Sequence, residues 1–197
     1  PVFHATAVTH RHEPILPVVA TGVPVEDNNL LIAVFRAAEL LDDLRARKYP
    51  VKMVYCPPEA VGHIAIVSTE VPFANYSRML AHAIWGSFAG RSSWMLIVVE
   101  DDIDPTDMKQ VLWSLGTRCH PDRGIFKNPN APAPSLLPFL NAYEREHNIG
   151  AHVLLDCTWP RDWPKEDIPV KASFDSLWPQ EIQETVLKNW TDYGYKE

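Results

Sequence analysis

The residues best suited to chemistry form one acidic run at positions 100–107. Five of these eight residues are acidic, and they follow an apolar stretch at 94–99. Carboxylates at the carboxyl end of a buried strand could hold Mg²⁺ together with a phosphate group. A second interpretation is structural: Asp104 before Pro105 has the pattern of a helix N-cap, and Asp107 falls three residues later, near the positive helix end. Capping accounts for all three residues, so we favour it over a metal site.

The histidines give a weaker signal. His10 and His12 would share one face of a strand, which is the geometry of a pair of metal ligands. A pattern of two residues is weak, so we favour solvated or hydrogen-bonded histidines. The sequence has no Walker loop, no GxGxxG after a strand and no GxSxG. Neither a nucleotide-binding protein nor a serine hydrolase is therefore predicted.

Composition narrows the class of protein. The 197 residues are 46% hydrophobic, enough for one domain, or one domain with an appendage. A net charge of -7 argues against a nucleic-acid partner. No apolar run is long enough to span a membrane and no signal peptide is evident, so we expect a cytoplasmic chain. Cys56, Cys119 and Cys157 lie far apart in the sequence and are expected to be buried, reduced thiols.

The elements that position these residues alternate between strand and helix. Strands are predicted at 3–8, 15–19, 51–56, 63–67, 94–99 and 152–156, and helices at 29–47, 73–85, 106–115 and 179–190. Asp27 or Asn28 is expected to cap the first helix. Residues 122–150, rich in proline and asparagine, are expected to form a surface excursion or an interface arm. The alternation after residue 50 favours an α/β fold with a mixed or mainly parallel sheet flanked by helices.

Four ordered segments resemble one enzyme family. They are VVEDDIDPTDMKQVLWSLGTRCHPDR at 98–123, AVTHRHEPILPV at 7–18, VLLDCTWP at 153–160 and VLKNWTDYGY at 186–195. In order and spacing they resemble the UbiD family of carboxy-lyases, and the ending is more similar to its ferulic and phenolic acid decarboxylase branch. The resemblance covers nearly the whole of this chain but only the C-terminal part of the family.

The resemblance implies a domain layout. Residues 1–27 would be the terminal strands of a cofactor-binding split barrel, and 28–48 would be a linker helix. Residues 49–160 would be an α/β oligomerisation domain, and 161–197 a C-terminal arm and helix. The implied fold is therefore the α/β sheet flanked by helices, preceded by barrel edge strands and a linker helix, and followed by a C-terminal helix.

The resemblance also implies chemistry. The family uses prenylated FMN with a divalent metal for reversible decarboxylation of aromatic, heteroaromatic or α,β-unsaturated carboxylic acids. Its catalytic Glu–Arg–Glu network and its metal ligands would precede Pro1, so no catalytic or metal-binding residue is expected here. The chain alone is expected to be inactive and to bind no cofactor. Asn28, Ile32, Pro134 and Leu136 would form part of the substrate-pocket wall. Phe88 stands where the ferulic acid branch has a lysine that reaches the cofactor, so cofactor-binding residues of this chain are unknown.

Three functional hypotheses result. The leading one is the C-terminal part of a UbiD-like decarboxylase, and the alternative is a separate scaffolding or oligomerisation subunit that partners a catalytic chain. The third is a Mg²⁺-dependent phosphate enzyme built on the acidic run. We expect a homo-oligomer, at least a dimer, because Trp178, Trp190, Tyr193 and Tyr195 cluster near the end of the chain and need covering. The other expected partners are the N-terminal cofactor domain and a small carboxylic acid.

Overall fold

A computed structural model describes residues 2–18, 22–23 and 25–196. The chain divides into two compact units, one formed by Pro1–Val71 with Asn75–Thr158 and the other by Pro72–Ala74 with Trp159–Glu197. None of the helices in the described ranges combines the length and the apolarity that crossing a bilayer requires. The cytoplasmic location inferred from the sequence stays a prediction.

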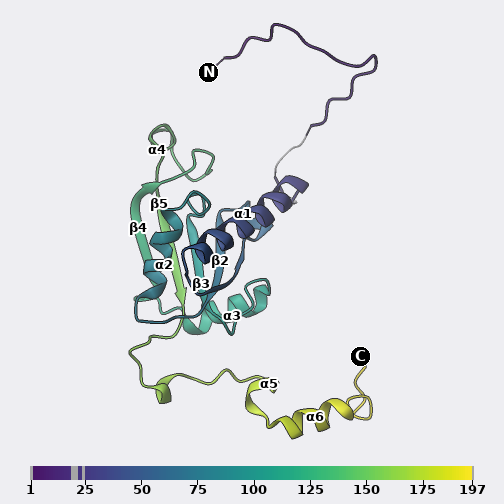
Figure 1. Cartoon of the computed structure of the whole chain (residues 1–197), viewed down its shortest axis with the longest axis vertical. Coiled ribbons are helices and arrows are strands. Elements are labelled where there is room, and N and C mark those ends of the chain that lie inside the picture. Colours follow the sequence, from purple (N-terminus) through teal and green to yellow (C-terminus); the bar gives the residue numbers. More distant parts are fainter. Residues whose placement is uncertain (1, 19–21, 24, 197) are drawn as a thin grey trace. The chain divides into compact units, whose positions relative to one another are not determined.

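The first unit is built on a five-stranded mixed sheet (Figure 1). Its strands, in spatial order, are β1 (Val51–Tyr55), β2 (Ile64–Thr69), β3 (Met95–Glu100), β5 (Ile149–Cys157) and β4 (Ile125–Pro132). The three central strands run parallel, and the edge strands β1 and β4 run antiparallel to their neighbours. The predicted mixed sheet is confirmed. The central strands are apolar along most of their length because helices cover both faces.

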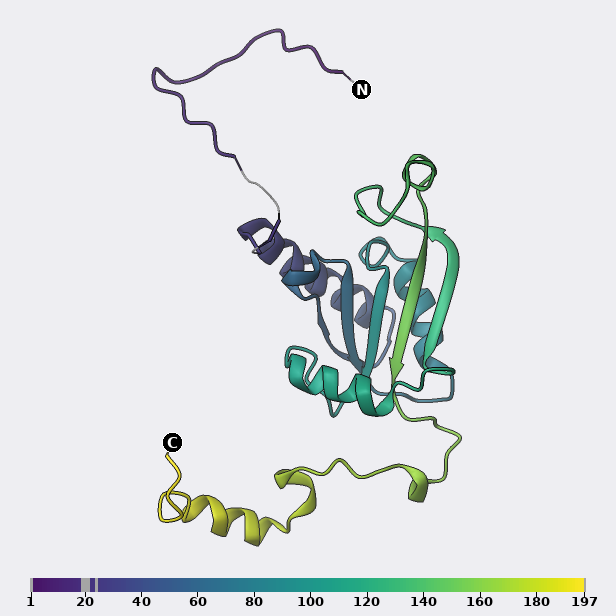
Figure 2. The ribbon, with the colours of Figure 1, turned by 180° about the vertical axis from the view of Figure 1, so that it is seen from behind.

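The helices divide between the two faces of the sheet (Figure 2). Leu96 and Val98 of β3 face α1 (Asp27–Ala46) and α2 (Tyr76–Trp85), whereas Ile97 and Val99 face α3 (Met108–Arg118). This alternation follows from the period of two in a strand. A short 3-10 helix, η1 (Pro58–Ala60), lies in the connection between β1 and β2.

Helix α1 begins slightly earlier than predicted. Its N-cap is Glu26, whose carboxylate accepts hydrogen bonds from the backbone N–H groups of Asn28 (2.7 Å) and Asn29 (3.1 Å). The prediction of Asp27 or Asn28 as the cap is therefore wrong. Both residues already lie in the first turn, where the N–H groups still need an external acceptor.

The segment 122–150 is more regular than predicted. It contains β4, which pairs with β5, and α4 (Ala142–His147), which starts with a capping box between Asn141 and Glu144. Pro129 and Pro132 made β4 resemble a loop in the sequence. An edge strand tolerates proline because one of its sides makes no ladder hydrogen bonds, and the register of β4 shifts between Pro129 and Ala131.

The two strands predicted at 3–8 and 15–19 are not formed in the described residues. Residues 2–18 contain neither helix nor strand, and Val19 lies outside the described part of the chain. Phe3 and Leu16 are 89% and 83% exposed. A strand needs a hydrogen-bonding partner, and alternation of apolar residues alone does not supply one.

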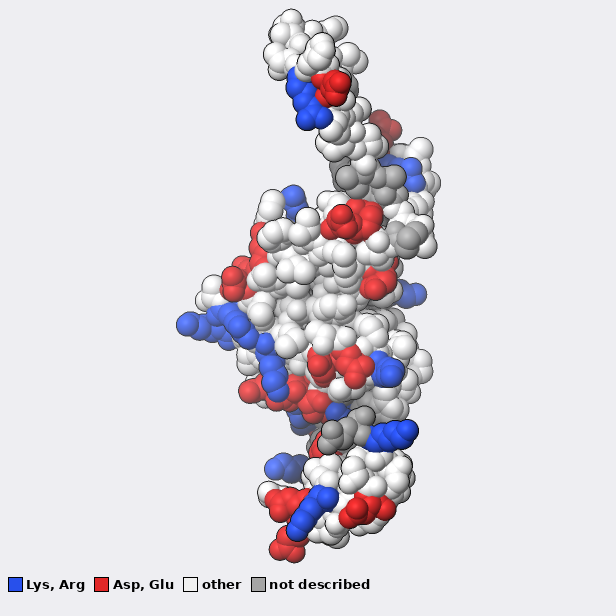
Figure 3. Space-filling view, turned by 90° about the vertical axis from the view of Figure 1, so that its right-hand side faces the viewer, with Lys and Arg blue, Asp and Glu red and all other residues white. Residues whose placement is uncertain are grey.

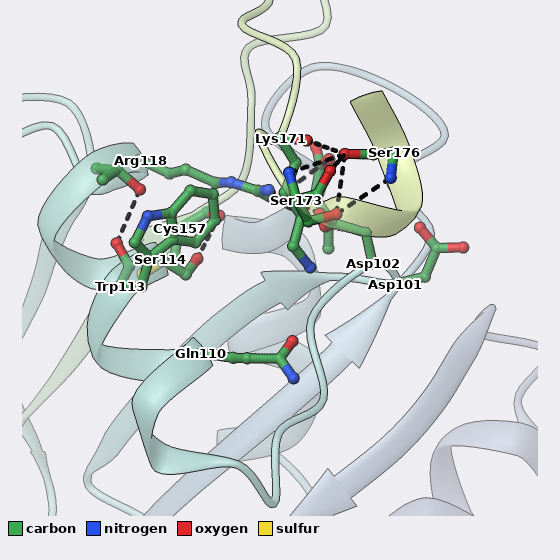
Figure 4. Close-up of polar contacts among 12 residues, drawn as sticks. Asp101, Asp102, Gln110, Trp113, Ser114, Arg118, Cys157, Lys171, Ser173 and Ser176 are labelled. Carbon is green, nitrogen blue, oxygen red and sulfur yellow. Dashed lines mark hydrogen bonds and ion pairs between the residues drawn. The ribbon is translucent and has the colours of Figure 1, made fainter. Parts of the chain in front are cut away.

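The second unit is helical. It contains η2 (Lys165–Asp167), α5 (Phe174–Leu177) and α6 (Gln180–Lys188), which confirms a helix in the predicted range 179–190. Ser173 caps α5 by accepting a hydrogen bond from the Ser176 N–H (3.2 Å), as Figure 4 shows. None of these three helices contains a buried residue among those described.

Candidate functional site

The acidic run lies where β3 ends and leads into α3. Arg118, in the last turn of α3, donates two hydrogen bonds to the Asp102 carboxylate (2.8 and 2.7 Å) and lies 3.8 Å from Glu100. The Arg118 side chain is 2% exposed, and its guanidinium also lies 5.1 Å from the centre of the Trp113 ring (Figure 4). A bidentate arginine–carboxylate pair fixes geometry strongly. Two of the five acidic residues therefore join the end of α3 to the end of β3.

Two further acidic residues shape the start of α3. Asp107 is the N-cap and accepts a hydrogen bond from the Lys109 N–H (2.9 Å). Asp104 instead accepts from the N–H (2.8 Å) and the hydroxyl (2.7 Å) of Thr106, which closes the preceding turn. Hydrogen bonds from Thr106 lower the pKa of Asp104, and the Lys109 N–H lowers the pKa of Asp107. The sequence predicted Asp104 as the N-cap and Asp107 three residues inside the helix. That prediction is wrong: Asp107 itself is the cap, and the Asp104 side chain bonds the turn before it.

A shallow cavity of about 390 Å³ lies beside the acidic run. Its wall includes Asp101, Asp104 and Gln110, together with Lys52, whose ammonium donates to the Asp101 carbonyl (2.9 Å). Within the described ranges, no three histidine, cysteine or acidic side chains are grouped to hold a metal ion. His10 and His12 are both exposed. The metal-site alternative gains no support from this geometry.

A second polar cluster was not found from the sequence. Asp156, near the end of β5, accepts three hydrogen bonds at its Oδ1 atom: from the Ser77 hydroxyl (3.0 Å), the Thr158 N–H (3.1 Å) and the Thr158 hydroxyl (2.7 Å). Ser77 lies in the first turn of α2. Burial raises the pKa of Asp156, although these hydrogen bonds oppose the effect. The available signal was an aspartate within the apolar stretch 153–157.

The predicted pocket-wall residues lie in two segments, the start of α1 and the stretch after β4, at the end of the sheet opposite to the acidic run. Asn28 and Ile32 belong to the first turns of α1, and Pro134 and Leu136 follow β4. Both segments lie beside the amino ends of the parallel strands, away from the acidic run (Figure 1). Leu136 is 86% exposed, whereas Ile32 and Pro134 are half-buried. All four residues lie at the same end of the sheet, as one pocket wall would require. Their role in a pocket wall stays a prediction.

Side-chain contacts hold both of these segments, the start of α1 and the stretch after β4. Arg36, one turn after Ile32, donates to the Gly62 carbonyl (2.6 Å) between β1 and β2. Phe139, beyond Leu136, packs edge to face on Trp94, with ring centres 5.3 Å apart. Trp94 immediately precedes β3. Both segments are therefore held at the amino ends of the parallel strands by Arg36 and Phe139, which are not among the predicted pocket-wall residues.

The described residues contain no grouped ligand set for the metal of the implied cofactor. A flavin phosphate bound through a divalent metal needs several oxygen or nitrogen ligands in one place. The described residues offer no such group. At the position of the family lysine, Phe88 is 72% exposed, and the Arg91 guanidinium lies 4.2 Å from the centre of its ring. No step of cofactor chemistry is assigned to these side chains.

The face shown in Figure 3 carries no large patch of basic side chains. On the side shown in Figure 3, acidic and basic side chains are interspersed, and neither kind gathers into one large patch. This agrees with the net charge of -7.

Known proteins resemble the chain along most of its length. Residues 29–157 match the 3-octaprenyl-4-hydroxybenzoate carboxy-lyase C-terminal domain. Pyrrole-2-carboxylic acid decarboxylase from Pseudomonas aeruginosa is 32% identical, over 99% of this chain and 41% of its own length. The closed form of vanillic acid decarboxylase from Sedimentibacter hydroxybenzoicus has a TM-score of 0.73 and 28% identity, covering 93% of this chain and 37% of that one.

More distant structures share the fold. The UbiD-class enzyme HmfF from Pelotomaculum thermopropionicum, in complex with FMN, has a TM-score of 0.61 and 24% identity, covering 74% of this chain and 32% of that one. Its evolved dimeric form, in complex with prFMN, has a TM-score of 0.52 and 22% identity, covering 72% and 28%. The chain spans about two fifths of the length of the curated relatives it matches. It belongs to the UbiD family of carboxy-lyases, and residues 29–157 correspond to the C-terminal domain of that family.

Proposed function

We propose that this chain is the oligomerisation and pocket-wall part of a prenylated-FMN-dependent decarboxylase. The complete protein would act reversibly on aromatic, heteroaromatic or α,β-unsaturated carboxylic acids. The observation that carries the proposal is the 32% identity to a pyrrole-2-carboxylic acid decarboxylase over 99% of this chain. The solved vanillic acid decarboxylase supports the same reaction class.

The proposed division of labour assigns proton transfer and cofactor binding to residues outside this chain. Two observations support this. Asp102 is engaged by Arg118, and Asp156 is half-buried and already accepts three hydrogen bonds. In this proposal residues 1–27 complete the cofactor barrel, 28–48 link the domains, 49–160 assemble the oligomer and 161–197 form the C-terminal arm. Asn28, Ile32, Pro134 and Leu136 then limit the shape of the substrate acid.

An activity comparison tests the division of labour. The complete protein and this chain alone would be supplied with prFMN and assayed for CO₂ release from pyrrole-2-carboxylate and vanillate. We expect turnover by the complete protein only. Turnover by the chain alone, above a control without protein, would contradict the proposed absence of the catalytic network. No turnover by either on a wider panel of unsaturated acids would count against the reaction class.

Purification under mild conditions separates this proposal from the alternative subunit. The solved vanillic acid decarboxylase structures include a separate component, ShVdcD, so a second chain is a concrete possibility for a relative of that enzyme. A stable complex of this chain with a distinct catalytic polypeptide would favour a scaffolding subunit. Light scattering would test self-association, and a monomer at micromolar concentration would contradict the proposed oligomer.

The pocket wall has its own test. Leu136→Ala in the complete, active protein should change the relative kcat/KM values of small and large substrate acids by several-fold, because one or two methylene contacts are worth about 1–3 kcal/mol. Leu112→Ala is a matched control, since Leu112 is also exposed, at 61%, and lies on α3. Equal changes in the relative kcat/KM values for both variants would contradict the proposed role of Leu136 in the pocket wall.

A further inference from the structure

Two of the three cysteines, distant in sequence, meet between α3 and the sheet. Cys119 directly follows the last residue of α3, and Cys157 is the last residue of β5. Cys157 is 0% exposed in the apolar cluster beneath α3, and Cys119 is half-buried and packs against that cluster. Cys56 belongs to the cluster on the other face of the sheet. The fold therefore places Cys119 and Cys157 in the same region, whereas Cys56 lies on the other face of the sheet.

A shared backbone acceptor holds Cys119 beside Asp156, the residue that precedes Cys157. The Cys119 thiol donates to the Gly124 carbonyl oxygen (3.7 Å), and the N–H of Asp156 donates to the same oxygen (2.7 Å). A Cβ atom at Gly124 would lie 2.7 Å from the His120 carbonyl oxygen, so a side chain at this position would disturb the approach.

The other side of the pair is fixed from α3. The Ser114 hydroxyl donates to the Cys157 carbonyl oxygen (3.4 Å), so α3 is hydrogen-bonded to β5 next to the thiols (Figure 4). The Cys157 thiol donates to the Leu155 carbonyl oxygen (3.8 Å), and the two thiols lie close enough to alter each other's pKa. This contact between a helix end and a strand end is present in the reduced protein, with both sulfurs free.

The two thiols differ in reactivity. Burial raises the pKa of both, and the effect is large for Cys157. The neighbouring Cys157 side chain opposes part of the increase in the pKa of Cys119. Because the thiolate is the nucleophile and Cys119 is the more accessible sulfur, Cys119 should react first.

We propose that Cys119 and Cys157 form a redox-responsive pair that a peroxide converts into an intramolecular disulfide. The Cys119 thiolate attacks one peroxide oxygen, the O–O bond breaks, and Cys119 becomes a sulfenic acid as hydroxide leaves. The Cys157 sulfur then attacks the Cys119 sulfur and releases water. In total, two thiols and one hydrogen peroxide give one disulfide and two waters. The bond closes segment 120–156 into a loop, which contains β4, Pro134 and Leu136.

The test is peroxide titration of the reduced full chain with hydrogen peroxide, followed by intact mass measurement and peptide mapping. We expect a mass loss of two hydrogen atoms, one peptide pair joined through Cys119 and Cys157, and reversal by dithiothreitol. The oxidation rate should rise roughly tenfold per pH unit below the pKa of Cys119, because the thiolate fraction does. Cys56→Ser is the matched control and should leave the mass loss and the crosslink unchanged.

Cys119→Ser should abolish the mass loss of two hydrogen atoms, with the circular dichroism spectrum confirming that the variant is folded. If that variant does not fold, peptide mapping of the unmodified sequence decides the question alone. The proposal is overturned by higher oxides of Cys119 without the crosslink, by disulfides only between chains, by pairing that includes Cys56, or by thiols that stay reduced. None of these outcomes depends on decarboxylase activity.

Discussion

The two faces of the central sheet are covered in different ways. On one face, α1 and α2 pack Leu44 and Leu80, both 0% exposed, against the strands in the larger apolar cluster. On the other face, α3 alone contributes Val111 to a smaller cluster. Ile125 of β4, which pairs with Leu155 of that smaller cluster, remains 37% exposed. The apolar cluster under α3 is therefore smaller than the cluster under α1 and α2.

The difference shows what directional contacts contribute where burial is small. Helix α3 is joined to β3 by the Arg118–Asp102 pair and to β5 by the hydrogen bond from Ser114. Apolar contact is non-directional, whereas a bidentate ion pair specifies one arrangement. We infer that apolar burial contributes most to holding α1 and α2, which also make polar contacts through Arg36 and Ser77, and that the bidentate ion pair of Arg118 contributes relatively more to positioning α3.

The largest expected effect tests the well-covered face. Leu80→Ala should lower the free energy of unfolding by about 2–5 kcal/mol, because it removes a fully buried side chain and leaves a cavity. Met79→Ala, next to it and 41% exposed, should change it by less than about 0.5 kcal/mol. Urea titration measures both. Equal losses would mean that the α2 face does not depend on the packing described.

The next effect tests the face covered by α3. Arg118→Met should cost about 2 kcal/mol, less than the 3–5 kcal/mol typical of fully buried pairs, because the Asp102 side chain is 38% exposed and can be hydrated. Asp102→Asn should cost less, since Arg118 keeps Glu100 nearby at 3.8 Å. The same urea titration ranks the two. A neutral Arg118→Met would show that packing alone positions α3.

A smaller effect concerns pH and the half-buried carboxylate of Asp156, which lies on β5 and accepts a hydrogen bond from Ser77 of α2. Burial raises the pKa of Asp156 in the folded chain, so its stabilising contribution is present at low pH and is lost as pH rises through that pKa. Asp156→Asn keeps an Oδ1 acceptor for Ser77 and Thr158 without the buried charge. Near neutral pH we expect no loss of stability and a flatter pH dependence. A marked loss at neutral pH would show that the charge itself stabilises the fold.

The smallest effect separates the two acidic residues before α3. Asp107→Ala removes the N-cap and should lower the thermal midpoint, whereas Asp104→Ala opens only the turn closed by Thr106 and should lower it less. Differential scanning calorimetry measures both midpoints. The reverse order would restore Asp104 as the effective cap.

Many elements could be predicted from local patterns. The strands β1, β2, β3 and β5 and the helices α1, α2 and α3 of the first unit, and α6 of the second, lie close to their predicted ranges, because apolar runs and helical spacing are properties of short segments. The strand β4 was missed because its prolines are tolerated only at a sheet edge. The strands predicted at 3–8 and 15–19 are not formed in the described residues of these ranges, because a β-rich or apolar run does not by itself provide a pairing partner.

The candidate site was less predictable for the same reason. The sequence placed the acidic run at the end of a strand, but it could not show that Asp102 binds Arg118 from the far end of α3. It gave no means to group Asp156 with Ser77, or Cys119 with Cys157. These pairs depend on which strands are neighbours, and β5 lies between β3 and β4.

The sequence by itself determined the element types, the mixed α/β class and the resemblance to UbiD carboxy-lyases, since all three depend on residues close together or on ordered motifs. Only the tertiary structure decided that the acidic run is largely engaged in structural contacts and that two cysteines form a pair. The physical reason is distance along the chain: which residues far apart in the sequence come into contact depends on the order of the strands in the sheet, and local patterns do not specify that order.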